Sequence, residues 1–207
     1  YVTMKERACH SLGIETEIKR LTKDTSTTEL QQIIKDLNDD QTVDGILLQH
    51  PVPKQIDEIK CFNTICIEKD VDGVTTEGFG NMAMGLNAFG SCTPLGIMRI
   101  LDHYKINLEG MNALVIGRSQ ILGKPMAAML LNANATVTIA HSKTKNLKNS
   151  LKEFDLVVVA VGVPKFVSAN DLKEGSVLVD AGYHPAQKCG DVDTVSYTHL
   201  RAHETVE

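Results

Sequence analysis

The sequence predicts an α/β fold in two domains, and three observations support this prediction. Short apolar runs typical of buried strands alternate with segments of helical periodicity along the chain. Residues 155–161 and 177–180 are almost entirely apolar, as expected for parallel strands that are covered on both faces. At residues 114–125 a buried strand, a glycine loop and a helix start follow one another directly. The chain is therefore expected to contain a parallel, doubly wound sheet.

This strand, loop and helix indicate a Rossmann-like domain that holds a dinucleotide phosphate. Gly117 allows a sharp turn beside a ligand, and Pro125 suits a first helical turn, where its missing N–H costs nothing. The free N–H groups of that turn and the helix dipole attract an anion. The loop departs from the usual G-x-G-x-x-G pattern, because Arg118 and Ser119 stand before Gly123 where a second glycine is expected.

The residues after the following strand favour NADP over NAD. We expect that strand at residues 136–140, and an NAD-binding protein usually ends it with an acidic residue that holds the ribose 2′-hydroxyl. Here His141, Ser142 and Lys143 follow without an acid, and Arg118 lies in the preceding loop. A 2′-phosphate would find hydrogen-bond donors and positive charge there. Taken singly, Arg118 or Lys143 is more often a solvated surface charge.

Composition argues against several other classes of protein. The 207 residues carry a net charge of −5 with the basic residues spread along the chain, so we expect no nucleic-acid partner. The longest apolar run, residues 157–163, is too short to cross a bilayer, so we expect no membrane partner. Five cysteines without a C-x-x-C pair indicate reduced thiols in a cytoplasmic protein. The seven histidines show no ligand spacing, so no metal is expected.

The remaining elements follow from periodicity and capping signals. Ser26 and Glu29 form a capping-box pattern, and apolar residues at helical spacing follow, so this helix should bury one face. The predicted helices span about 1–12, 26–37, 56–62 and 126–132, and another starts at Thr93. The predicted strands span 14–21, 43–49, 136–140, 155–161 and 177–180. A charged turn is expected at 68–73.

Four polar residues outside the glycine loop are candidates for chemistry. Tyr1 and Lys5 share one helix face, where a tyrosine could stack on a flat ring and a desolvated lysine could transfer protons. Gln49 ends a predicted strand, at the edge of the sheet where ligands bind in α/β folds. Asp72 lies in an Asp-Gly turn and could bind an amino-pyrimidine. Each also has an ordinary structural interpretation, as a surface contact, a loop cap or a turn, and Cys92 is interpreted as structural.

Taken in order, the motifs resemble the bifunctional methylenetetrahydrofolate dehydrogenase/methenyltetrahydrofolate cyclohydrolase family. The resemblance extends from Tyr1 to about Asp193. The motifs that carry it are Tyr1-Val2-x-x-Lys5, Gly45-Ile46-Leu47-Leu48-Gln49-His50-Pro51, Lys69-Asp70-Val71-Asp72-Gly73, Cys92-Thr93-Pro94-x-Gly96, Val115-Ile116-Gly117-Arg118-Ser119-x-x-x-Gly123-x-Pro125, His141-Ser142-Lys143-Thr144, Val179-Asp180-x-Gly182 and Gly190-Asp191-Val192-Asp193.

The resemblance implies two reactions on tetrahydrofolate derivatives. NADP⁺ takes a hydride from 5,10-methylenetetrahydrofolate, and water then opens the methenyl product to 10-formyltetrahydrofolate. It implies that Tyr1 stacks on the folate, that Lys5 transfers protons, that Gln49 orients Lys5 and that Asp72 holds the pterin. The cofactor site it implies comprises Gly117, Arg118, Ser119, Gly123, His141, Ser142 and Gly162, with Arg118 and Ser142 on the 2′-phosphate.

The resemblance also sets expected domain boundaries. Residues 1–92 would form the folate-binding catalytic domain and residues 93–194 the Rossmann-like NADP-binding domain, each lacking its outer end compared with the family. Residues 195–207 leave the family pattern and can be back-translated to a transposase adapter used for sequencing libraries, so we expect a non-native tail there. A homodimer would fit the predicted fold.

Two other interpretations of the chain stay open at this point. One is another two-domain NADP dehydrogenase, such as a shikimate-dehydrogenase-like protein, which a panel of substrates would distinguish. The other is a protein that binds NADP weakly and has no catalytic activity, which an assay of a folded chain would reveal.

Overall fold

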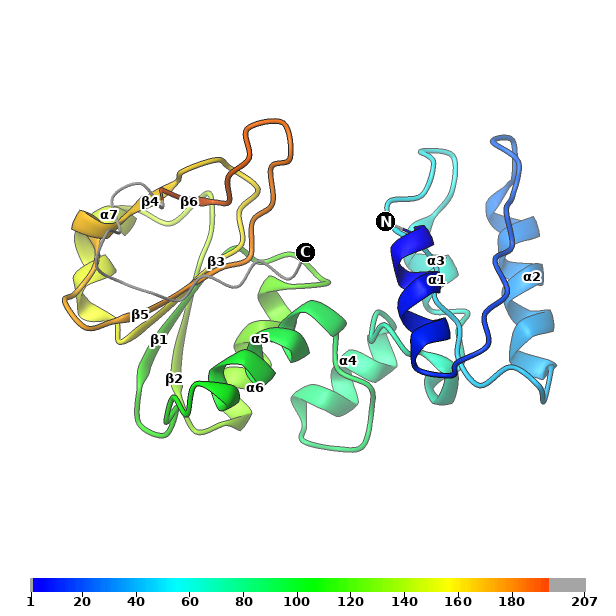
Figure 1. The fold of residues 1–207 in the computed structure, drawn as a ribbon, viewed down its shortest axis with the longest axis horizontal. Helices are drawn as coiled ribbons and strands as arrows, with labels where there is room; N and C mark the ends of the chain where they lie inside the picture. The colour runs from blue at the N-terminus through cyan, green and yellow to red at the C-terminus, as the bar shows by residue number, and fades with distance from the viewer. Residues whose placement is uncertain (1, 194–207) are drawn as a thin grey trace. The chain divides into compact units, whose positions relative to one another are not determined.

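The computed structural model describes residues 2–193, and these form two compact units (Figure 1). The first unit ends at Glu77 and the second begins at Gly78. Tyr1 and residues 194–207 lie outside the described residues. The stacking role of Tyr1 and the adapter-derived origin of residues 195–207 therefore stay predictions.

The first unit is mainly helical. Its capping box is confirmed: the Ser26 backbone N–H donates to Glu29 at 2.7 Å, and the Glu29 N–H donates to the Ser26 hydroxyl at 3.2 Å. Hydrogen bonds from the Ser26 N–H and then from its hydroxyl hold the pKa of Glu29 below its usual value. The helices are α1 (Val2–Ser11), α2 (Thr27–Asp39), α3 (Glu58–Phe62) and the 3₁₀ helix η1 (Ile67–Lys69), and α4 (Thr76–Ala83) crosses the boundary between the units.

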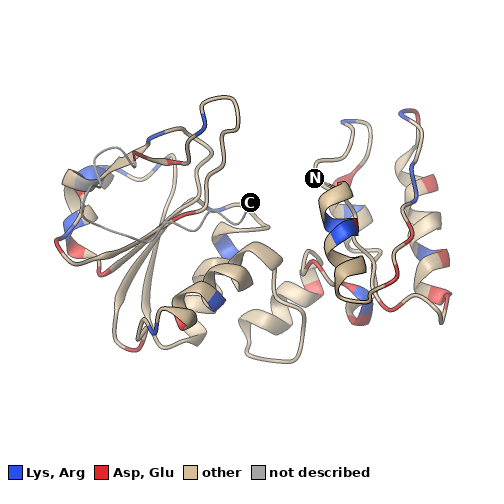
Figure 2. Ribbon diagram, in the orientation of Figure 1, with Lys and Arg blue, Asp and Glu red and all other residues tan. Residues whose placement is uncertain are grey.

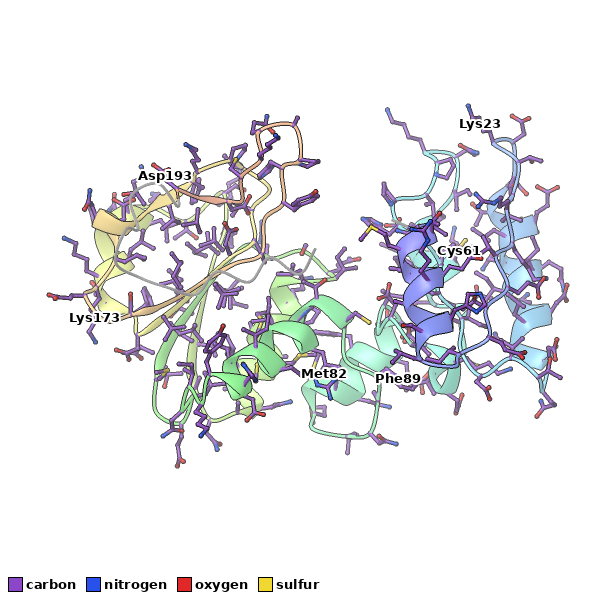
Figure 3. The ribbon with its side chains drawn as sticks, in the orientation of Figure 1. Lys23, Cys61, Met82, Phe89, Lys173 and Asp193 are labelled. Atoms are coloured by element: carbon purple, nitrogen blue, oxygen red, sulfur yellow. The ribbon has the colours of Figure 1, made fainter. Side chains whose placement is uncertain are left out.

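A small apolar core holds the first unit together. The buried residues of this core come from α2, from the segment before the His50-Pro51 break, and from α3 with the turn after it; they are Leu30, Ile34, Ile46, Cys61 and Ile65. The side chain of Cys61 is fully buried, and this burial, followed by the nearby charges of Asp57 and Glu58, raises the pKa of its thiol (Figure 3). Cys61 is therefore a core residue rather than a reactive thiol.

The two strands predicted in the first unit are wrong. Residues 14–21 form no strand, and residues 43–49 contribute only an isolated bridge between Ile46 and Asp70, in which the Ile46 N–H donates to the Lys69 carbonyl at 2.8 Å. Ile46 is buried but Leu47 is 41% exposed. An apolar sequence becomes a strand only when a second strand accepts its hydrogen bonds, and the described part of this unit supplies no ladder beyond that bridge.

The second unit contains the predicted parallel sheet. Its strands are β1 (Asn112–Ile116), β2 (Thr136–Ala140), β3 (Leu156–Val159) and β5 (Val177–Asp180), in the spatial order β2-β1-β3-β5 and all parallel. A second, two-stranded parallel sheet pairs β4 (Val167–Ser168) with β6 (Val192–Asp193). The helices are α5 (Cys92–His103), α6 (Gly123–Asn132) and α7 (Leu147–Ser150), with the 3₁₀ helices η2 (Leu151–Glu153) and η3 (Ala169–Asp171).

Alternate residues of the strands pack on opposite faces of the larger sheet. Ala113 and Val115 of β1 pack with apolar residues of α5 and α6, whereas Leu114 and Ile116 pack with Leu151 and with residues of the smaller sheet. All four residues of β3 are buried, which explains why its sequence is a continuous apolar run. The doubly wound arrangement predicted from the sequence is thus confirmed (Figure 1).

The surface of residues 2–193 carries charges of both signs. Figure 2 shows lysines and arginines interspersed with acidic residues on the helices and loops of both units. No helix among residues 2–193 is long and apolar enough to cross a membrane.

Lys69 closes the carboxyl end of α2. Its ammonium group donates to three backbone carbonyls, those of Leu37 at 3.0 Å, Asn38 at 2.7 Å and Asp40 at 2.8 Å. Carbonyls at a helix end lack partners within the helix, and a cation there also interacts favourably with the helix dipole.

We expect Lys69→Met to lower the free energy of unfolding by about 2 kcal/mol, because it leaves these carbonyls without their charged donor. Urea unfolding followed by circular dichroism measures the loss. Lys35→Met, at an exposed position of the same helix, is the matched control and should leave stability nearly unchanged. Equal urea midpoints for the two variants would contradict the role of Lys69.

Candidate functional site

The glycine loop after β1 is shaped by two close backbone approaches. Gly117 has φ +124°, and a Cβ atom there would collide with the carbonyl oxygen of Ala160 at the end of β3. A Cβ atom on Gly123 would collide with the carbonyl of Gly117 itself. Both positions therefore require glycine, and the loop folds back tightly on the end of the sheet.

Ser119 supports the first turn of α6 from within this loop. Its hydroxyl accepts from the Gly123 N–H at 3.2 Å, and its carbonyl accepts from the Lys124 N–H at 3.0 Å. Arg118 and Ser119 are exposed, whereas Pro125 is buried in the first turn, as predicted. The serine in place of a second glycine therefore helps to fix the start of the helix, next to the exposed arginine.

The turn after β2 has a defined local structure. The His141 N–H donates to the Thr144 hydroxyl at 2.9 Å, and the Lys143 N–H donates to His141 Nδ1 at 3.1 Å. An imidazole that accepts through Nδ1 carries its proton on Nε2. Ser142 and Lys143 are exposed in this turn.

The sheet brings these two turns to neighbouring strand ends. Ile116 of β1 is in register with Ala140 of β2, and the Gly117 N–H donates to the Ala140 carbonyl at 2.8 Å. Arg118 and Ser142 thus follow adjacent parallel strands at their carboxyl ends, which is where ligands bind in open α/β sheets. The arrangement presents donors and positive charge at one edge of the sheet.

A buried aspartate organises the loop after β3. Asp191 is fully buried, and one of its carboxylate oxygens accepts from the N–H groups of Val161 at 2.7 Å and Gly162 at 2.8 Å. Its other oxygen lies 2.8 Å from Nε2 of His184. Gly162 is exposed with φ +66°, and its N–H is already used by Asp191. Any contact of Gly162 with a ligand would therefore involve its carbonyl or its lack of a side chain.

A second aspartate extends this network. The carboxylate of Asp180, the last residue of β5, accepts from the N–H groups of Gly182 at 2.9 Å, Asp191 at 2.9 Å and Val192 at 3.1 Å. Sequence reasoning quoted both aspartates as parts of motifs but gave them no role. The signal in the sequence that could have indicated a role is a glycine close to each aspartate. A Cβ atom on Gly182 would collide with the Asp191 carboxylate, and one on Gly190 would collide with the Asp180 carboxylate.

In the first unit the structure brings together Lys5 and Gln49, which are 44 residues apart in sequence. The Lys5 ammonium lies 3.5 Å from Oε1 of Gln49, and Nε2 of Gln49 donates to the His50 carbonyl at 2.8 Å. Asp72 is half-buried in the turn after η1, next to Gly73 at φ +62°. The preceding Asp70 is buried and shapes that turn by accepting from the Val74 and Thr75 N–H groups.

A metal site is not apparent among the described residues. Within residues 2–193 no group of three or more histidine, cysteine, aspartate or glutamate side chains is arranged to hold a metal ion. The arrangement can instead bind an anionic dinucleotide at the strand ends of the second unit, and it offers an amine next to an amide in the first unit.

Comparison with protein families gives two matches that together cover most of the chain. Residues 1–72 match the catalytic domain of tetrahydrofolate dehydrogenase/cyclohydrolase, and residues 91–205 match the NAD(P)-binding domain of the same family. Among curated proteins, the bifunctional protein FolD of Alcanivorax borkumensis is 56% identical over 93% of this chain and 68% of the relative. The FolD protein of Acidobacterium capsulatum is 57% identical over the same shares.

Solved structures agree with these matches. The FolD methylenetetrahydrofolate dehydrogenase/cyclohydrolase of Campylobacter jejuni superposes with a TM-score of 0.92 at 41% identity, covering 95% of this chain and 71% of that one. The methylenetetrahydrofolate dehydrogenase-cyclohydrolase of Trypanosoma brucei, solved with NADP and an inhibitor, gives a TM-score of 0.87 at 28% identity, covering 95% and 70%.

The tight loop leads to a prediction for Gly123. We expect Gly123→Ala to lower the free energy of unfolding by about 1–3 kcal/mol and to weaken dinucleotide binding, because its methyl group meets backbone that cannot rotate away. Thermal unfolding and titration with a fluorescent reduced dinucleotide measure the two effects.

Gly96→Ala is the matched control, because Gly96 lies within α5 and a Cβ atom there meets open space. It should keep binding intact and slightly stabilise the helix. Unimpaired binding and stability in Gly123→Ala would show that the loop is not constrained in this way.

Proposed function

The chain belongs to the tetrahydrofolate dehydrogenase/cyclohydrolase family, and from that membership we propose that it catalyses both reactions of one-carbon transfer on tetrahydrofolate. It oxidises 5,10-methylenetetrahydrofolate with NADP⁺ and hydrolyses the methenyl product to 10-formyltetrahydrofolate. The observation that carries the proposal is the contact between the Lys5 ammonium and Gln49 Oε1 at 3.5 Å, within the region that matches the catalytic domain. On its basis we assign proton transfer to Lys5 and the orientation of Lys5 to Gln49.

The oxidation needs positioning rather than acid or base catalysis. A hydride leaves the methylene bridge and its electron pair goes to the nicotinamide, so the protein must hold the two carbons close together. We assign the binding of NADP to three loops, which follow β1, β2 and β3 and contain Gly117, Ser119 and Gly123, then His141, and then Gly162. Within this site we assign the 2′-phosphate to Arg118 and Ser142. The adjacent strand ends that present Arg118 and Ser142 support this assignment, as does the absence of an acid after β2.

The hydrolysis needs a base near a cation. Water forms a bond to the methenyl carbon while Lys5 accepts a proton, and the bond from that carbon to N5 then breaks with its electron pair going to N5. One water proton ends on N5 and the other is released through Lys5, so the atoms balance. A cationic substrate favours the uncharged form of a neighbouring amine, and Gln49 Oε1 fixes the direction in which that amine points. We assign Asp72 to the pterin and Tyr1 to stacking on it.

The same proposal covers the organisation of the chain. Residues 1–92 bind folate and residues 93–194 bind NADP, in keeping with family matches at 1–72 and 91–205. A homodimer in the cytoplasm completes the proposal, and five cysteines without a C-x-x-C pair suit a reducing compartment.

The proposal is tested by mixing the purified chain with 5,10-methylenetetrahydrofolate and NADP⁺, then NAD⁺, and following reduced cofactor by absorbance. Reduction that is faster with NADP⁺ supports it. A chain that circular dichroism shows to be folded, but that reduces neither cofactor, would instead favour a dinucleotide-binding protein without catalytic activity.

Lys5→Met separates the two reactions. It removes the proton acceptor but keeps the length of the side chain, so we expect cyclohydrolase activity to fall at least about 100-fold while NADP⁺ reduction persists. Loss of methenyltetrahydrofolate absorbance measures the hydrolysis. Lys23→Met is the control, since Lys23 is exposed on a loop (Figure 3). Hydrolysis at the wild-type rate in Lys5→Met would remove Lys5 from the mechanism.

Arg118→Gln tests the choice of cofactor. The loss of a charged partner should raise KM for NADP⁺ about tenfold or more, whereas KM for NAD⁺, which has no 2′-phosphate, should change little. Lys152→Gln, which removes an exposed charge on η2, should leave both constants unchanged. A parallel rise for both cofactors would place Arg118 elsewhere in the site.

A further inference from the structure

The orientation of Gln49 depends on the backbone of the next residue. Its amide has two ends, and each has a different partner: Oε1 faces the Lys5 ammonium at 3.5 Å, and Nε2 donates to the His50 carbonyl at 2.8 Å. An amide group is planar, so fixing Nε2 also fixes the direction of Oε1. The position of residue 50 therefore determines where Gln49 can accept a hydrogen bond from Lys5.

His50 is in turn held by its own side chain. Nδ1 of its ring lies 2.6 Å from Oε1 of Glu58, and the same carboxylate oxygen accepts from the Val52 N–H at 3.3 Å. Glu58 therefore binds both sides of the break that follows Gln49. The ring of His50 also lies beside that of the buried Phe62, with 6.5 Å between ring centroids.

Helix α3 provides a fixed base for this carboxylate. Glu58 is the first residue of α3, and the N-cap residue Asp57 accepts from the Lys60 N–H at 3.2 Å. At the other end of the helix, Cys61 and Phe62 are buried. Glu58 thus projects from an anchored helix, whereas Gln49 and His50 lie in a segment without regular structure.

We propose that Glu58 and His50 are positioning residues for the Lys5–Gln49 pair, an inference that rests on the proposed function of that pair. Glu58 holds His50, the His50 carbonyl holds the Gln49 amide, and the amide directs the Lys5 ammonium. The His50–Glu58 pair is partly exposed, with side-chain exposures of 42% and 28%. A contact this exposed contributes little to stability, so we expect its effect to appear in the rate of hydrolysis.

The test compares Glu58→Ala with Glu58→Gln in the full chain. Alanine removes the acceptor for His50 and Val52, and we expect the kcat of cyclohydrolysis to fall about tenfold with little change in KM, since small misplacements of a catalytic group are costly. The rate of NADP⁺ reduction, which needs no base, should stay near that of the wild type. Glutamine keeps an acceptor oxygen at the same place and should restore most of the hydrolysis.

Lys60→Met is the matched control, because it breaks the other charge pair of α3, the 2.9 Å contact between Lys60 and Asp57, without touching His50. It should leave both reactions unchanged. In a double-mutant cycle, His50→Ala with Glu58→Ala should lose no more hydrolysis than the worse single variant, because both changes remove one link of the same chain.

The outcomes distinguish this inference from the proposed function. If the wild-type chain carries out neither reaction, the proposed function fails and this inference fails with it. If the wild type is active, three results overturn the inference alone: hydrolysis at the normal rate in Glu58→Ala, an equal fall of both reactions, or a Glu58→Gln variant as impaired as Glu58→Ala.

Discussion

The close approach of three backbone segments at the end of the central strand is the constraint on which the second unit depends. Gly117 follows β1 and lies against the carbonyl of Ala160, the residue after β3, and Gly123 starts α6 against the Gly117 carbonyl. Any side chain at these positions would push the strand, the loop and the helix apart. Because the same contacts leave Arg118 and the start of α6 at the sheet edge, the packing of the loop and the proposed cofactor site depend on a single geometry.

Aspartate carboxylates perform an analogous task in both units. The buried Asp70 closes the turn that carries Asp72, the buried Asp191 holds the loop that follows β3, and the exposed Asp180 holds the loop that follows β5. In each case a carboxylate accepts from two or more backbone N–H groups that no helix or strand satisfies. A buried charge is tolerated only with such partners, so Asp70 and Asp191 each also fix the loop around them. Asp72 and Gly162 thus lie on loops that hydrogen bonds to aspartate carboxylates hold in place.

The four-stranded sheet of the second unit could be predicted because its signals are local, whereas the short pair β4 and β6 and helix α7 were not predicted. The β-branched run of β3, the bounds of β2 at residues 136–140 and the start of α6 near Pro125 follow from residue type and period alone. The first unit was harder, since segments 14–21 and 43–49 have strand-like composition but, among residues 2–193, find no partner strand beyond the single bridge of Ile46 with Asp70. Composition cannot reveal whether a partner is present, because pairing is a property of the fold.

The candidate site shows the same division between local and non-local information. Gly117 and Gly123 could be identified from a continuous motif, and the structure supplies the physical reason for each. The contact of Lys5 with Gln49 spans 44 residues, and spacing alone gave it little weight beside an ordinary surface lysine and a loop-capping amide. The roles of Asp191 and of the His50–Glu58 pair were not foreseen, because hydrogen bonds between loops leave no periodic trace in a sequence. The family resemblance indicated that the distant residues Lys5 and Gln49 act together. The structure adds the neighbours that hold Gln49 in place.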